Sequence, residues 1–278
     1  MLNVIVLGAS GYIGKQLYGA LAQQSGIEVE RWDGNIVTDK AAFPEDSIVF
    51  NCAAKRHGTT EQLIDVNVKA VANLLEGGKF RRFIHLSSSA ALQPWRSPYA
   101  VTKLMGEALC QYYVDKKIPV SFVRLYNVFG PEQPSEFVIP TIIEQAIQGD
   151  AICVKNAAAS RRFIYIKDVV NGLIALTKER KFKTKYSLEG MEKVSIRDII
   201  AEVSAATLKS FEIKQTEKAK IDNDAVELGM GLMPHISKYG YTPFSKAIKE
   251  TIEYYAIHRQ KRKQKGEGTK NISHSSAY

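Results

Sequence analysis

A tyrosine and a lysine four residues apart, Tyr99 and Lys103, are well placed for proton transfer in this 278-residue sequence. Both fall on one face of a predicted helix. Tyr99, at the start of this helix, stands ten residues beyond Ser89, the last of three serines that end an apolar run. A phenol of ordinary pKa near 10 is a poor base at neutral pH, but a neighbouring ammonium lowers that pKa. Tyr99 could then remove a proton from a hydroxyl that is becoming a carbonyl, while Ser89 hydrogen-bonds the same oxygen.

Two other Tyr-x-x-x-Lys pairs, Tyr112/Lys116 and Tyr113/Lys117, occur later in the same predicted helix, so the spacing by itself decides nothing. Tyr99 differs because it stands at the start of that helix, just after the hydroxyl cluster, whereas the other pairs lie at its far end. We therefore predict Tyr99, Lys103 and Ser89 as the catalytic residues.

A second chemical signal lies at the amino terminus, where a short β-branched run stops at Gly8 and glycines recur at Gly11 and Gly14. Helical spacing follows them. Glycine suits such a turn because a Cβ would keep the backbone away from a pyrophosphate, and the new helix points unpaired N–H groups at that anion. Asp33 ends the next apolar segment, where an acid could accept hydrogen bonds from an adenosine ribose. These features predict a dinucleotide site, the alternative being a purely structural turn.

Strand-like and helix-like segments alternate through the first half of the chain. The predicted strands are residues 2–7, 27–32, 47–51, 81–86 and 119–126, and the predicted helices are residues 12–24, 60–76 and 98–115. This alternation predicts an α/β fold, a doubly wound parallel sheet of the Rossmann type. Strand 47–51 is placed on the far side of the first strand from strand 27–32, which creates the ligand crevice. Only 13 residues separate Asp33 from Ser47, so this connection must be abbreviated.

Small residues follow strand 47–51, in the order Asn51-Cys52-Ala53-Ala54, and would let a cofactor lie against the backbone. In the next helix Asn67 shares a stripe with apolar residues, where its amide needs hydrogen-bond partners. It is either a satisfied structural asparagine or a brace for the active-site backbone, and the residues alone leave both open.

The composition, 45% hydrophobic and 24% charged, is that of an ordinary globular chain. The apolar runs fall far short of the ~18 residues that span a bilayer, and we expect no signal peptide. Three widely spaced cysteines indicate neither a disulfide framework nor a metal site, which favours a reducing, cytoplasmic location. Much of the net charge of +9 comes from residues 257–278, a basic segment that we expect to be a disordered, solvated tail.

Taken together, the motifs resemble the extended short-chain dehydrogenase/reductases, and most of all the NAD-dependent epimerase/dehydratase enzymes of nucleotide sugars. The resemblance covers residues 3–256 and is carried by Gly8-x-x-Gly11-x-x-Gly14, Asn51-x-Ala53-Ala54, Asn67, Ser87-Ser88-Ser89, Tyr99-x-x-x-Lys103, Arg124-x-x-Asn127-Val128-Phe129-Gly130-Pro131, Arg161-x-Phe163-Ile164-Tyr165-Ile166-x-Asp168-Val169 and Tyr239-Gly240-Tyr241-x-Pro243.

The resemblance implies a role for each matching residue. Tyr99 is the implied base, Lys103 its partner and a ligand of the cofactor ribose, and Ser89 the hydroxyl polariser. The implied dinucleotide contacts are Gly8, Ser10, Gly11, Tyr12, Ile13, Gly14, Asp33, Ala53, Ala54, Asn67, Ser87, Tyr99 and Lys103. The implied substrate contacts are Ser89, Asn127, Arg161 and Arg162, with Arg161 at the nucleotide phosphates. Asn67 matches the structural asparagine of the family, which favours the brace.

The sequence also departs from the family pattern. Ala90 and Ala91 stand where the 4,6-dehydratases carry an Asp-Glu pair, and the nearby Glu of the decarboxylases is missing as well. Without a carboxylate for elimination, an epimerase or a ketoreductase remains. Arg161-Arg162-Phe163 replaces the usual Arg-Asp-Phe, the segment between Ser89 and Tyr99 is short, and no arginine occurs between Arg197 and Arg259. Either the two adjacent arginines compensate by bidentate phosphate contacts, or the substrate is not a UDP-hexose.

The sequence thus predicts an NAD-dependent nucleotide-sugar epimerase that transfers hydride reversibly at a sugar carbinol, at C4. The alternatives are an NAD(P)H-dependent 4-ketoreductase and a non-catalytic dinucleotide-sensing regulator, a class that tends to lose the tyrosine or the lysine. Asp33 favours NAD because it would repel a 2′-phosphate, whereas Arg31 would favour NADP if it turned toward the site. The expected partners are a nucleotide sugar and a second copy of the chain, with no nucleic acid.

The predicted organisation is a Rossmann domain of residues 1–127, to which a helix near residues 168–178 returns, and a smaller C-terminal substrate lobe that is mostly residues 128–256. Relatives dimerise through the helices that match residues 60–76 and 98–115, so the resemblance implies a homodimer.

Overall fold

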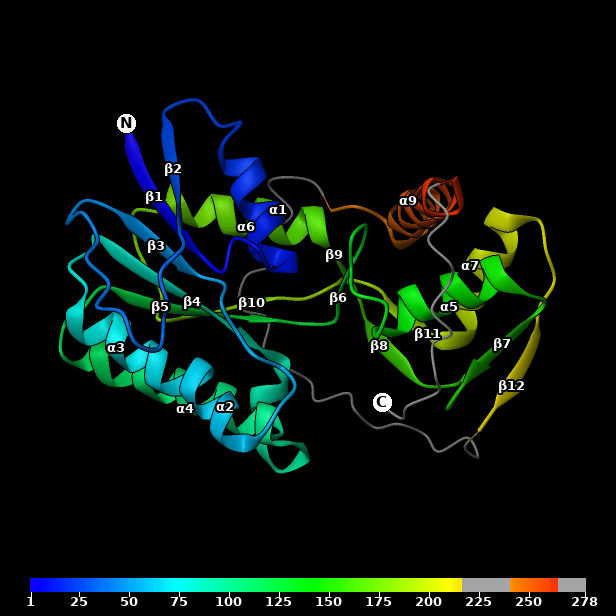
Figure 1. The fold of residues 1–278 in the computed structure, drawn as a ribbon, viewed down its shortest axis with the longest axis horizontal. Helices are drawn as coiled ribbons and strands as arrows, with labels where there is room; N and C mark the ends of the chain where they lie inside the picture. The colour runs from blue at the N-terminus through cyan, green and yellow to red at the C-terminus, as the bar shows by residue number, and fades with distance from the viewer. Residues whose placement is uncertain (217–240, 265–278) are drawn as a thin grey trace. The chain divides into compact units, whose positions relative to one another are not determined.

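The structure of the chain is a computed structural model that describes residues 1–216 and 241–264 (Figure 1). The described residues divide into two compact units. The first contains residues 1–126 and 167–189, and the second contains residues 127–166, 190–216 and 241–264. All six strands of the large sheet lie in the first unit, whereas the second unit contains two-stranded sheets and helices.

Six parallel strands form the central sheet of the first unit, in the order β10-β5-β4-β3-β1-β2. Their bounds are β1 Leu2–Leu7, β2 Ile27–Trp32, β3 Ile48–Asn51, β4 Arg82–Ser88, β5 Val120–Leu125 and β10 Lys185–Leu188. The predicted Rossmann-type sheet is confirmed, including its decisive feature, because β3 pairs with β1 on the side away from β2. This reversal of strand order opens a ligand crevice at the carboxyl ends of the strands.

Helices cover both faces of this sheet (Figure 1). The helices α1 (Tyr12–Leu21) and α6 (Ile166–Thr177) lie over one face, and α2 (Thr60–Ile64), α3 (Ala70–Gly77) and α4 (Pro98–Asp115) lie over the other. Every residue of β3 and β5 is buried as a result. Burial on both faces explains why these strands read as continuous apolar runs rather than as alternating patterns.

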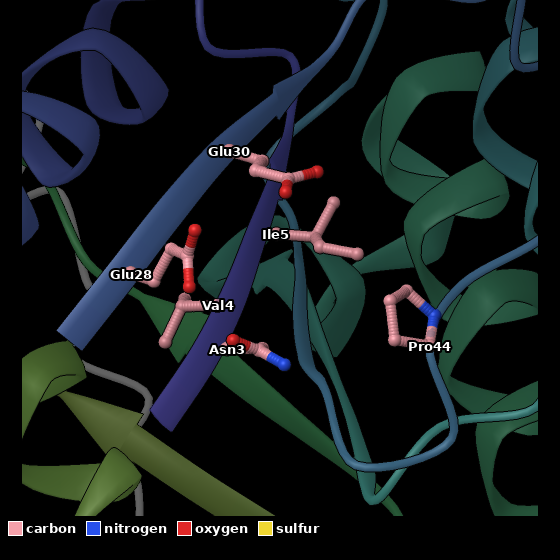
Figure 2. Close-up of a pocket in the computed structure, with 6 residues that line it drawn as sticks. All are labelled: Asn3, Val4, Ile5, Glu28, Glu30 and Pro44. Atoms are coloured by element: carbon pink, nitrogen blue, oxygen red, sulfur yellow. The ribbon is translucent and has the colours of Figure 1, made fainter. Parts of the chain in front are cut away.

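The connection between β2 and β3 contains no helix, as its length predicted. Ala41 and Phe43 of this connection are buried in the same apolar cluster as Ile5 of β1. An irregular segment therefore covers this part of the sheet, where doubly wound folds usually have a helix. Part of this face stays open. A shallow pocket there is lined by Asn3, Val4, Ile5, Glu28, Glu30 and Pro44 (Figure 2). It lies along β1 and β2 and contains none of the predicted site residues.

One strand of the sheet was not expected. Residues 181–189 were assigned to the substrate lobe, but β10 pairs in parallel with β5 and belongs to the first unit. Tyr186 and Leu188 of β10 are buried, because the strand completes the sheet beside β5. The returning helix was expected near residues 168–178 and is found as α6.

The second unit is built around aromatic residues from distant parts of the chain. The ring centroid of Phe129 lies 5.7 Å from that of Tyr165 and 5.2 Å from that of Phe244. Its strands are β6 Val128–Phe129, β7 Ala151–Val154, β8 Ser160–Arg162, β9 Ile164–Tyr165, β11 Lys193–Ser195 and β12 Glu212–Gln215, and its helices are α5 Val138–Gln148, α7 Ile196–Thr207 and α9 Phe244–Gln264.

The expected basic tail is helical in its first part. Helix α9 continues to Gln264, so residues 257–264, which were expected to be disordered, extend the last helix. Residues 265–278 of that tail, and Tyr239 and Gly240 of the expected closing signature, lie outside the described residues. No helix in the described part of the chain is long and apolar enough to cross a membrane.

Candidate active site

The turn after β1 requires glycine at two of its three glycine positions, Gly8 and Gly14. Gly8 has a φ of 71°, and its carbonyl accepts a hydrogen bond from the Gly11 amide at 3.0 Å. A Cβ added to Gly14 would lie 2.2 Å from the Gly8 oxygen, and one added to Gly8 would lie 2.7 Å from the Ala53 backbone. The turn is therefore packed closely against the residues that follow β3.

Helix α1 begins directly after this turn. Its N-cap, Gly11, provides no side-chain hydrogen bond, and the first turn of the helix contains no acidic residue. The positive dipole end of the helix is therefore not neutralised by an acid of its own first turn and can attract an anion. Together with the glycine backbone, this arrangement fits the pyrophosphate of a dinucleotide. Ser10, Tyr12 and Ile13 lie at the same helix start, with Ser10 exposed and the other two half-buried.

The backbone after β3 is held in place by Asn51. Its side-chain oxygen accepts a hydrogen bond from the Ala53 amide at 3.2 Å, and its side-chain nitrogen lies 3.3 Å from Nδ1 of His85. Ala53 and Ala54 therefore lie beside the glycine turn without large side chains between them. Asp33 follows β2 directly and is exposed. The structure thus places the predicted dinucleotide contacts between Gly8 and Ala54 at the carboxyl ends of β1, β2 and β3, and the other four on later elements.

Asn67 braces this region, and it does so from an irregular turn. The expected continuous helix over residues 60–76 contains a π-helical turn at Asp65–Lys69, between α2 and α3. The buried Asn67 amide accepts a hydrogen bond from the Lys55 amide and donates one to the Lys55 carbonyl, both at 2.8 Å. It donates another to Thr102 of α4 at 3.0 Å. One side chain thus joins the loop after β3 to the helix that carries Tyr99.

Replacing Asn67 with alanine should destabilise the protein by about 1–3 kcal/mol, because Lys55 and Thr102 lose buried hydrogen-bond partners. Thermal or urea unfolding measures this loss. Asn73→Ala is the matched control on the following helix, since Asn73 is exposed and bonds only the Val37 carbonyl at 2.9 Å among the contacts described. Asn73→Ala should change the free energy of unfolding by no more than about 0.5 kcal/mol. Equal losses for the two variants would show that Asn67 is not a brace.

Tyr99 lies in the first turn of α4, where Ser97 caps the helix through a hydrogen bond from the Ala100 amide at 3.2 Å. Burial raises the pKa of the Tyr99 phenol, while a hydrogen bond with the Ser88 side chain and the nearby Arg56 cation lower it. The sequence had paired the phenol with Ser89 and Lys103. The structure instead brings Ser88 to the phenol, because Ser88 is the last residue of β4 and Ser89 already begins the next turn, Ser89–Leu92.

Lys103 lies one helical turn after Tyr99 and is almost completely buried. Its Nζ donates a hydrogen bond to the Leu86 carbonyl of β4 at 2.7 Å. Burial lowers the pKa of Lys103 to about 8. An ammonium in such a site is therefore close to losing its proton near neutral pH, and its charge depends on the few groups around it.

Ser87, predicted as a cofactor contact, has a partner within the protein. It is buried, and its hydroxyl donates to Oε1 of Glu107 at 2.6 Å. The hydroxyl proton is thus used within the protein, and the oxygen can act only as an acceptor toward a ligand. The three serines after Leu86 thus separate: Ser87 points to Glu107, Ser88 bonds Tyr99, and Ser89 is half-buried at the start of the following turn.

The predicted substrate residues of the second unit lie on β8 and beside it. Asn127, with a φ of 34°, donates to the Arg162 carbonyl at 3.1 Å. Arg161 and Arg162 are adjacent on a strand, so their side chains leave opposite faces. The Arg162 guanidinium also donates to the Met191 carbonyl. The Arg161 guanidinium likewise donates to a backbone carbonyl, that of Ser160, at 3.0 Å. The hypothesis that the two arginines bind one phosphate stays a prediction.

Three residues of the site were missed by sequence reasoning. Ser88 was hidden among three serines, and Arg56 follows no pattern that would single it out. Glu107, by contrast, lies one turn after Lys103, at the same spacing that links Lys103 to Tyr99. Among residues 1–216 and 241–264, no group of three or more His, Cys, Asp or Glu side chains could hold a metal ion.

Comparison with known proteins matches the chain to one family model, to curated relatives and to solved structures. The model of the NAD dependent epimerase/dehydratase family matches residues 4–188. The chain is 27% identical over 311 residues to the UDP-N-acetyl-alpha-D-glucosaminuronate decarboxylase of Bacillus cytotoxicus, covering 90% of this chain and 97% of that protein. It is 30% identical over 237 residues to the CDP-abequose synthase of Salmonella typhimurium, covering 71% and 78%. The UDP-glucuronic acid 4-epimerase from Bacillus cereus in complex with NAD has the same fold, with a TM-score of 0.77, 23% identity, and 92% and 99% coverage.

Proposed function

Because the chain belongs to the NAD dependent epimerase/dehydratase family, we propose that it is a nucleotide-sugar epimerase that retains NAD and uses Tyr99 as its base. The observation that supports this most is the joining of β4 to α4, where Tyr99 bonds Ser88 one turn before the buried Lys103. These residues lie in the same unit as the glycine turn that fits a pyrophosphate.

The proposed cofactor contacts are the glycine turn, the start of α1, Asp33, Ala53 and Lys103. NAD, when bound there, supplies a hydride acceptor that can return the hydride later. Asp33 would repel a 2′-phosphate, and the Arg31 guanidinium lies 5.3 Å from the ring centroid of Tyr18 on α1. Since Arg31 packs on that ring, the structure favours NAD over NADP.

In the proposed reaction, the Tyr99 phenolate accepts the proton of a sugar hydroxyl as the carbinol carbon loses hydride, and it returns the proton after the keto sugar has turned over. Ser88 or Ser89 donates a hydrogen bond to the same sugar oxygen. The phenol must first ionise, which its burial opposes. The nearby Arg56 cation offsets this effect because it favours the phenolate, and the proposal gives Lys103, on the same helical face, the same role.

The chemistry of the site supports epimerisation over elimination. Ala90 is half-buried and Ala91 is buried, at the positions where the dehydratases of the resemblance carry acids. Neither side chain can move a proton or expel water. At this end of β4, Tyr99 can accept a proton from a hydroxyl, but positions 90 and 91 carry no carboxylate for elimination.

The proposal is tested by incubating the purified protein with UDP-glucuronic acid, UDP-N-acetylglucosamine, UDP-glucose and CDP- and dTDP-hexoses. Product identity is followed by chromatography and the cofactor by absorbance near 340 nm. An epimerase gives an isomer with no net change in NADH. Stoichiometric oxidation of NADH with a 4-keto sugar would show the ketoreductase instead, and dinucleotide binding without any turnover would show the regulator.

We also propose a homodimer that forms through α4. This helix exposes an apolar stripe of Val101, Leu104, Met105 and Tyr112, each 38–56% exposed. Leu104→Glu should convert the dimer to a monomer, because a charge would then be buried at the interface. Size-exclusion chromatography with light scattering measures the mass. Met191→Glu, at an exposed apolar residue outside α4, should leave the dimer intact. A monomeric unaltered protein would contradict this proposal.

We propose the cytoplasm as the location of the protein. The three cysteines are free thiols, which fits a reducing compartment.

A further inference from the structure

A buried carboxylate lies beneath the Tyr99–Lys103 pair. Glu107 is 3% exposed, and it accepts two hydrogen bonds from Arg124 of β5, Nε to Oε1 at 2.7 Å and Nη2 to Oε2 at 2.5 Å. Ser87 of β4 donates to Oε1 of the same carboxylate at 2.6 Å. Because the pair is bidentate and lies between three elements, its geometry is fixed more tightly than that of a surface ion pair.

Three consecutive residues of β4 are connected to three residues of α4 that are spaced one turn apart. Leu86 accepts a hydrogen bond from Lys103, Ser87 donates to Glu107, and Ser88 bonds Tyr99. The end of the strand and the face of the helix therefore have one fixed register. Of the six residues in these three connections, Glu107 also bonds the side chain of Arg124 on β5.

Glu107 also contributes to the electrostatics around Lys103, where burial is the largest effect. The groups that act on Lys103 are Cys52 after β3, Cys110 and Glu107 on α4, and His85 on β4. Burial raises the pKa of Cys52, and it raises that of Cys110 to about 12, so both thiols are neutral at physiological pH. Burial also lowers the pKa of His85, which is therefore neutral too. Among the groups that act on Lys103 in the described chain, Glu107 alone is an anion.

We propose that Glu107 is a positioning residue for the Tyr99–Lys103 pair: clamped by Arg124 and Ser87, it holds the end of β4 against α4 and places a carboxylate one helical turn from Lys103. An ordinary buried ion pair adds little net stability, because desolvation offsets the attraction. An effect on Lys103 gives the Glu107–Arg124 ion pair a function other than stability. The inference rests on the proposed function in one respect: Lys103 is taken to bind the cofactor and to be the partner of the base, Tyr99.

Two variants separate the structural part of this role from the electrostatic part. Glu107→Gln removes the charge but leaves Arg124 buried and unpaired, so its unfolding temperature should fall clearly. Glu107→Gln combined with Arg124→Gln removes both charges and should recover most of that temperature. Asp115→Asn is the matched control, because Asp115 is an exposed acid on the same helix that accepts from Gln111 at 3.0 Å.

The decisive measurement is NADH affinity, by fluorescence, from about pH 6 to about pH 9, the range that brackets the pKa of Lys103, which is about 8. Affinity should fall as Lys103 loses its proton. In the single variant this fall should begin at lower pH, giving binding about tenfold weaker than the wild type near pH 8 but similar binding near pH 6. The double variant should show a smaller shift in the same direction, and Asp115→Asn none. Wild-type affinity of the double variant at every pH would overturn the inference.

A second readout needs no cofactor. Because the folded pKa of Lys103 lies below the unfolded value of 10.5, the folded state prefers the neutral amine, and stability gained from Lys103 rises with pH between about 8 and about 10.5. This rise should be absent in Lys103→Met and should begin at lower pH in Glu107→Gln. If the wild type binds no NADH, the proposed function fails, and this profile still decides the role of Glu107. An onset unchanged by Glu107→Gln would overturn it.

Discussion

Tyr99→Phe should lower turnover by about 10²–10⁴-fold, the usual contribution of a positioned general base, and leave the fold intact. The phenol oxygen is the group in the described site that is placed to accept a proton, through its position beside Ser88 and Arg56. Removing it leaves the ring, and hence the packing at the start of α4, in place. The measurement is the rate of isomer formation on the best substrate of the panel, with circular dichroism and NADH affinity as checks on folding and binding.

The chain contains its own matched control for this variant. Tyr112 also precedes a lysine by four residues, but its ring is 56% exposed at the far end of α4. Tyr112→Phe should therefore retain wild-type turnover. Full activity in Tyr99→Phe would refute the assigned base, whereas equal losses in both variants would point to a general effect on α4 rather than to proton transfer.

Gly14→Ala should remove dinucleotide binding and destabilise the fold. The added Cβ would lie 2.2 Å from the Gly8 carbonyl oxygen and 2.8 Å from its carbon, both of them backbone atoms. The turn must therefore move away from the start of α1, which costs about 1–3 kcal/mol as in other overpacked sites. A displaced turn cannot present its amides to a pyrophosphate, so the dissociation constant for NADH should rise by at least about a hundredfold, or about 2.7 kcal/mol.

Gly19→Ala is the control on the same helix. No atom lies within 4 Å of the Cβ it would add, and Gly19 is in the interior of α1. Alanine should stabilise the helix by about 0.5–1 kcal/mol and leave NADH affinity unchanged. Calorimetry on the two variants measures both quantities. Normal NADH affinity in Gly14→Ala would exclude the glycine turn as the cofactor site, whatever the change in stability.

Local patterns in the sequence were sufficient for the framework of the first unit. The bounds of β1, β2 and α4 agree with the predicted segments, because each combines a clear periodicity with a clear stop: glycine after β1, and Ser97-Pro98 before α4. The order of β3, β1 and β2 followed from a general rule of doubly wound sheets. The glycine turn and the position of Tyr99 were predictable for the same reason, since a strand, a tight turn and a helix start are set by neighbouring residues.

The remaining features depend on contacts between distant residues. β10 joins the sheet through β5, some 60 residues earlier, and its four residues carry no signal for that partner. The π-helical turn at Asn67 forms where a buried amide must reach both Lys55 and Thr102, which no periodicity records. Whether the adjacent Arg161 and Arg162 bind one phosphate also depends on tertiary contacts, because their side chains leave opposite faces of β8.

The sequence by itself therefore determined the class of fold, the glycine turn, and a tyrosine and lysine on one helical face, because these depend on residue type and short spacings. Only the tertiary structure decided which serine meets the phenol, that Lys103 is buried with its amine on Leu86, and that Glu107 and Arg124 lie beneath it. The physical reason is that hydrogen bonds and charge interactions depend on distances between elements and on burial. Both are set when β4, β5 and α4 pack together, and not before.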